Sequence, residues 1–228
     1  MRAGVMNAGV FDIAERAKPF AKEQKVHERV SATASGWSQE AFARQQIQNL
    51  VRQVFSSAEP AVRHVVFSEV EMDTDVSEVC WSVGQTLAGE KSGDVLVAVS
   101  SEAEAVEFET NWANDLKSHA QRVSRSLWCL SVPHMDRRSV MNAEGLRSFM
   151  TEVRREFEYS VIGDSVGGWS VRTTLAGSAD GMVLVLSALR TRRASARKLL
   201  EELSHARLLG TVLKDREFPI PEGIYHRL

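Results

Sequence analysis

Short apolar runs separated by amphipathic stretches constrain the fold of this 228-residue chain more than any other feature. The runs are rich in Val and Leu on both faces of an extended chain, which is typical of strands buried in a parallel sheet. They are Val62–Phe67, Val95–Val99, Leu127–Val132, Tyr159–Ile162, Met182–Ala188 and Leu208–Leu213. We therefore expect six buried strands.

Apolar residues at helical spacing lie between most of these runs. The stripes are Val76, Val79, Cys80, Val83 and Leu87; Ala105, Phe108, Trp112 and Leu116; Leu146, Phe149, Met150, Val153 and Phe157; and Ala196, Leu199, Leu200 and Leu203. Alternation of strand and helix predicts an α/β protein with three layers, in which helices cover both faces of a mostly parallel sheet. The most apolar runs should be its central strands, namely Val62–Phe67, Val95–Val99, Tyr159–Ile162 and Met182–Leu186.

Composition favours one such domain with a short appendage. Residues 1–36 are a polar lead-in that we expect to be partly ordered, and residues 37–228 form the single α/β domain, starting with a helix that Ser38 caps.

With 28 Lys and Arg against 30 Asp and Glu, the net charge of −2 excludes general attraction to nucleic acid. No apolar run reaches the ~18 residues of a membrane-spanning helix, and the first residues lack a signal-peptide core. The expected location is the cytoplasm.

The segment after the first buried strand, Ser68–Glu78, is acidic. In this class of fold a ligand usually binds where such a strand turns into a helix. A phosphate loop at that place needs glycines and a lysine, and this turn contains neither. It carries Glu69, Glu71, Asp73, Asp75 and Glu78 instead. We expect no ordinary nucleotide site here. Asp75 and Glu78 have the spacing of a reciprocal helix cap, and an acidic cation site is the alternative interpretation.

The order of the segments resembles a known family. Phe149–Ile162, Ala179–Arg193 and Leu208–Leu213, with Gln45–Phe55 and Val62–Ser68 upstream, are similar to the cytoplasmic bacterial tyrosine kinases of capsule and exopolysaccharide biosynthesis. Those kinases are relatives of the MinD/ParA P-loop ATPases. The resemblance implies a P-loop NTPase-like fold over residues 40–228.

The chemical motifs of that family are degenerate in this sequence. The family's Walker A glycines and lysine are missing, so that the corresponding loop consists of Glu69, Glu71, Asp73, Thr74, Asp75 and Ser77. Ser77 alone keeps a magnesium-ligand type. The Walker B aspartate of the family falls at Gly163, and the nearest carboxylate, Asp164, comes one residue late.

The resemblance therefore implies a non-catalytic regulatory or interaction protein of exopolysaccharide biosynthesis or export, without a cofactor. Its expected partner is a membrane-associated polysaccharide chain-length or export component, or a second copy of itself, and it would be recruited to the inner face of the membrane. A divergent ATPase or tyrosine kinase that still binds ATP and Mg²⁺ remains the alternative.

A second alternative comes from Gly163-Asp-Ser-Val-Gly167, which fits the nucleophile-elbow pattern of serine hydrolases around Ser165. Asp180 and then His205 or His226 follow in the required order. The helix that should follow an elbow is not obvious in Trp169–Ala176.

A basic run, Arg190, Arg192, Arg193 and Arg197, is a candidate surface for an acidic partner. The more ordinary interpretation is a solvated helix face. The scattered histidines predict no metal site.

Overall fold

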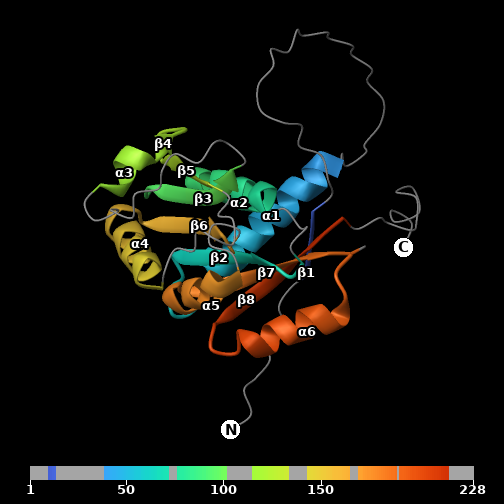
Figure 1. The fold of residues 1–228 in the computed structure, drawn as a ribbon. Helices are drawn as coiled ribbons and strands as arrows, with labels where there is room; N and C mark the ends of the chain where they lie inside the picture. The colour runs from blue at the N-terminus through green and yellow to red at the C-terminus, as the bar shows by residue number, and fades with distance from the viewer. Residues whose placement is uncertain are drawn as a thin grey trace, which may run out of the picture.

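The computed structural model describes residues 10–13, 39–71, 76–101, 115–133, 143–164, 169–188 and 190–215. Within them a single sheet carries helices on both faces (Figure 1). Its strands are β1 (Val10–Ile13), β2 (His64–Glu69), β3 (Val95–Ser101), β4 (Gln121–Arg122), β5 (Leu127–Pro133), β6 (Tyr159–Gly163), β7 (Gly181–Ser187) and β8 (Leu208–Lys214). The helices are α1 (Gln39–Phe55), α2 (Ser77–Glu90), α3 (Leu116–His119), α4 (Ala143–Glu156), α5 (Trp169–Ser178) and α6 (Arg193–Glu202).

The eight strands lie in the order β1-β8-β7-β2-β6-β3-β5-β4. Every neighbouring pair is parallel except β4 with β5. The four runs expected at the centre are the four central strands, β7, β2, β6 and β3, so the predicted three-layer, mostly parallel architecture is confirmed.

Alternate side chains of the central strands build the two faces of the core. Val65 and Phe67 of β2 pack with α1 and α2, whereas Val66 between them packs with α4 and α5. All six residues of β2 are buried. This two-sided burial explains why the strands have no alternation of polar and apolar residues. A third cluster joins β7 to α6 through residues such as Leu184, Leu199 and Leu203.

The helical stripes are largely confirmed. All five stripe residues of α2 are buried, as are the five that run from Leu146 to Phe157. On α6, Leu199 and Leu203 are buried but Leu200 is 40% exposed. The stripe from Ala105 to Trp112 and the Ser38 cap lie outside the described residues, and Leu116 begins the short helix α3.

Several elements differ from expectation, and the short antiparallel strand β4 is one of them. Trp169–Ser178 is a helix although no apolar stripe announces it, because its small Thr, Ala and Gly residues give it little amphipathic pattern. Strand β1 lies within the segment expected to be a lead-in, and it pairs with β8 from Val10↔Thr211 to Ile13↔Lys214. Among the described residues, no helix combines the length and the apolar character needed to cross a bilayer.

Candidate functional site

We call the place where the carboxyl ends of β2 and β6 lie side by side the carboxyl-edge site. These strands are neighbours, but the helices that follow them leave toward opposite faces, since α2 belongs to one core cluster and α5 to the other. In open α/β sheets, ligands bind where the connections diverge in this way. Ser68 and Glu69 of β2 and Asp164, directly after β6, meet at this place.

Asp164 is the centre of the carboxyl-edge site. Its Oδ2 accepts a hydrogen bond of 2.6 Å from the Ser68 hydroxyl and lies 2.6 Å from Nε of Arg172 in α5. Its Oδ1 accepts a 3.3 Å bond from the backbone N–H of Glu69. Asp164 is 2% exposed and Arg172 is 5% exposed. Both oxygens of the carboxylate are therefore engaged by groups of the protein itself.

The electrostatics of the pair follow from its burial. Loss of hydration raises the pKa of Asp164 above its ordinary value, whereas the Arg172 guanidinium and the donors from Ser68 and Glu69 favour the charged form. A carboxylate in such a dry place needs a cation, and Arg172 is that cation. The arrangement satisfies one buried charge with another.

Two further carboxylates of the acidic turn are also engaged. Glu78 in the first turn of α2 lies 3.3 Å from Nζ of Lys214, a 7% exposed lysine at the end of β8. Glu71 accepts a 3.1 Å hydrogen bond from the backbone N–H of Arg192, at the start of α6. An acidic group there complements the helix dipole. The carboxylates of Glu71 and Glu78 thus connect this turn to α6 and β8.

The predicted reciprocal cap of α2 pairs Glu78 with Asp75, which lies outside the described residues. The residue directly before the helix is Val76, which makes no side-chain cap, and the Glu78 carboxylate lies beside Lys214. Ser77 is the first residue of α2, and Glu69 is buried at the end of β2. The other residues of the predicted degenerate loop, Asp73, Thr74 and Asp75, lie outside the described residues.

Within the described ranges, no three His, Cys, Asp or Glu side chains gather closely enough to hold a metal ion. Ser187 and Asp215, at the ends of β7 and β8, are linked by a 2.8 Å hydrogen bond.

Two members of the predicted serine-hydrolase constellation, Asp180 and His205, lie among the described residues. Asp180 lies before β7, at the opposite edge of the sheet from Asp164, and accepts hydrogen bonds from the backbone N–H groups of Arg63 (2.8 Å) and His64 (2.9 Å). It also pairs with Arg154 at 2.7 Å. His205 precedes β8 and lies 3.2 Å from the carbonyl oxygen of Thr173. The two therefore serve local contacts. Ser165 and His226 lie outside the described residues.

The basic run surrounds the start of α6. The side chains of Arg190, Arg192, Arg193 and Arg197 are exposed. Two exposed leucines, Leu200 and Leu208, each 40% exposed, lie in and after the same helix. The surface thus combines positive charge with apolar area.

Comparison with solved structures gives fold relatives at low sequence identity. The chimerical protein CapA2B2 has a TM-score of 0.62 and 13% identity over 76% of this chain and 85% of that one. The kinase domain of the Escherichia coli tyrosine kinase ETK has a TM-score of 0.59 and 10% identity over 78% of each chain. A ParA family ATPase from Chlorobium tepidum has a TM-score of 0.51 and 17% identity, over 68% of this chain and 75% of that one.

No family model and no curated protein matches the chain. The structural likeness shows that it has the P-loop NTPase-like fold, similar to that of bacterial tyrosine kinase domains and ParA ATPases.

Two charged residues at the carboxyl edge, Arg172 and Lys214, were not predicted from the sequence. Arg172 lies in a helix that the apolar pattern did not reveal, so nothing connected it with Asp164. Lys214 follows directly on the apolar run Leu208–Leu213. A lysine that continues a buried strand needs an acidic partner, and this position is the signal by which the sequence could have revealed the pair.

Proposed function

We propose that this chain is a catalytically degenerate protein of the tyrosine-kinase and MinD/ParA type, which acts as a regulatory or interaction component of exopolysaccharide biosynthesis or export. The observation that carries the proposal is the state of Asp164. Its carboxylate is buried and holds Arg172, Ser68 and the Glu69 N–H, so a metal ion would have to displace a guanidinium from it.

The composition of the turn between β2 and α2 supports the same conclusion. Phosphoryl transfer depends on positioning and on neutralising phosphate charge with lysine and Mg²⁺. Residues 70–76 contain no glycine and no lysine. Each carboxylate near a triphosphate adds repulsion of about 1 kcal/mol at ~4 Å even in water. Two buried cations at this edge, Arg172 and Lys214, already have carboxylate partners.

A protein without catalytic groups works through contacts. The exposed arginines around the start of α6, with Leu200 and Leu208, offer a surface that fits an acidic partner carrying apolar residues. We assign this surface to a membrane-associated chain-length or export component, which would bring the protein to the inner face of the membrane. Self-association through the same surface is the alternative outcome.

A phosphotransfer assay tests the absence of catalysis. The purified chain is incubated with Mg²⁺ and ATP labelled on the γ-phosphate, and both phosphate release and protein labelling are followed. We expect neither to exceed the protein-free control. Mg²⁺-dependent release or tyrosine labelling that disappears in a Ser77→Ala variant would contradict the proposal and support the divergent kinase or ATPase.

A further inference from the structure

A groove between α4 and α5 forms a second polar site, which shares no residue with the carboxyl-edge site. It has a volume of about 330 Å³ and is lined by Arg147, Thr173, Thr174, Gly177 and Ser178. This volume falls at the lower end of those that hold small ligands, about 300–1,000 Å³. Arg147, Thr173 and Gly177 are exposed, so the groove opens to solvent.

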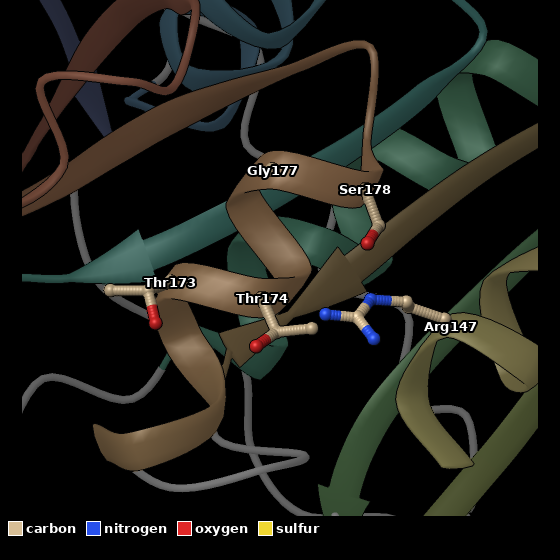
Figure 2. A pocket seen from close by; sticks show the side chains of 5 residues that line it. All are labelled: Arg147, Thr173, Thr174, Gly177 and Ser178. Atoms are coloured by element: carbon tan, nitrogen blue, oxygen red, sulfur yellow. The ribbon is translucent and has the colours of Figure 1, made fainter. Parts of the chain in front are cut away.

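The guanidinium of Arg147 is directed into this groove. Figure 2 shows Arg147 reaching from α4 toward α5, with its guanidinium facing the side chains of Thr174 and Ser178. Among the residues that the structure describes, Arg147 has no ion-pair partner, and its side chain donates no hydrogen bond. No carboxylate lines the groove.

A second arginine of α4, Arg154, has hydrogen-bond acceptors within reach at the end of α5. It lies seven residues after Arg147 and donates to the Ser178 carbonyl oxygen at 2.9 Å and to Asp180 at 2.7 Å. The hydroxyl of Thr151, which lies between the two arginines in the sequence, donates a 2.8 Å hydrogen bond to the carbonyl oxygen of Arg147. Arg147 faces hydroxyl groups, which can share an anion with its guanidinium.

We infer that this groove binds the phosphate group of a small phosphorylated molecule. A guanidinium presents a planar fork of N–H donors, and the hydroxyls of Thr174 and Ser178 beside it add further donors. A carboxylate is saturated by the fork alone, whereas the three terminal oxygens of a phosphate monoester can use the fork and the hydroxyls together. The rest of the bound ligand extends into solvent through the open side of the groove.

Calorimetric titration with phenyl phosphate tests this inference on the full chain, with inorganic phosphate and benzoate as comparison ligands. Phenyl phosphate should bind and benzoate should bind at least about tenfold more weakly, since it offers one acceptor oxygen fewer. Arg147→Ala should weaken phenyl phosphate binding about tenfold or more, because charge-assisted hydrogen bonds are lost. Thr174→Val, which keeps the side-chain shape, should weaken it by a smaller factor.

Arg197→Ala is the matched control, since it removes an exposed arginine from the basic run around α6 and should leave the affinity unchanged. Equal affinity in Arg147→Ala and the parent chain would overturn the assignment, as would equal binding of benzoate. Binding of a phosphoserine peptide but not of phenyl phosphate would replace the small molecule with a modified protein. None of these ligands contains a nucleotide, so the result does not depend on the proposed function.

Discussion

Nε of Arg172 lies 2.6 Å from Oδ2 of Asp164, with side chains that are 6% and 0% exposed. The pair joins α5 to the carboxyl end of β6, where this fold would place a ligand. The charge of Asp164 at the carboxyl-edge site is therefore compensated before any ligand arrives.

Removing one member of this pair should be costly. Arg172→Ala leaves Asp164 buried without its cation, which is expected to lower the free energy of unfolding by about 3–5 kcal/mol. The double variant Asp164→Leu with Arg172→Met should lose less than the single variant, because it removes both buried charges. Urea denaturation measures both, with Arg193→Ala as the exposed control. An Arg172→Ala variant as stable as the parent would contradict the assigned role of the pair.

Gly84 and Gly89 of α2 provide a matched test of the packing. A Cβ on Gly84 would overlap the side chain of Val97 in β3, whereas a Cβ on Gly89 would meet nothing within 4 Å. Gly84→Ala should therefore destabilise the fold by about 1–3 kcal/mol through overpacking. Gly89→Ala should stabilise it by about 0.5–1 kcal/mol, because alanine favours the helix. Thermal unfolding compares the two, and the same sign for both would contradict the described packing.

His64 should make the stability depend on pH. Burial, with the charges of Arg154 and Arg63, lowers the pKa of His64 to about 4, against the opposing influence of Asp180. Its ring lies 3.0 Å from the Ser160 hydroxyl. Because the folded state binds the proton less readily, the contribution is present above about pH 6.5 and is lost as the pH falls toward 4.

The loss should reach about 3 kcal/mol over that range. Denaturant unfolding between pH 7 and pH 4 measures it, and His64→Gln should flatten the slope. His205→Gln, at an exposed histidine, is the control. A slope that His64→Gln leaves unchanged would assign the pH dependence to other groups.

The proposed partner surface is tested by charge reversal. Arg192→Glu with Arg193→Glu changes exposed side chains and should alter stability by no more than about 0.5 kcal/mol. Association with the cytoplasmic part of the host's polysaccharide chain-length protein should weaken, and the parent's association rate should fall steeply with salt as the Debye length shrinks from about 10 Å at 0.1 M. Surface plasmon resonance follows both. Arg44→Glu on α1 is the control, and unchanged association would remove the arginines from the interface.

The central part of the fold could be predicted from the sequence, because β2, β3, β6 and β7 are largely buried on both faces and their runs consist mainly of apolar residues. The site could not be predicted to the same depth. Asp164 was identified only as a carboxylate one residue out of place, and its role depends on Arg172, which lies in a helix without an apolar stripe. The bond from the Arg192 N–H to Glu71 joins residues far apart in sequence, and local spacing carries no sign of such a contact.

Calorimetric titration of the full chain with ATP and Mg²⁺ tests the central claim most directly. If internal charges occupy the carboxyl-edge site, ATP should show no binding tighter than millimolar, with or without Mg²⁺, and the same should hold for ADP. A micromolar isotherm that requires Mg²⁺ and disappears in Ser77→Ala would contradict the account.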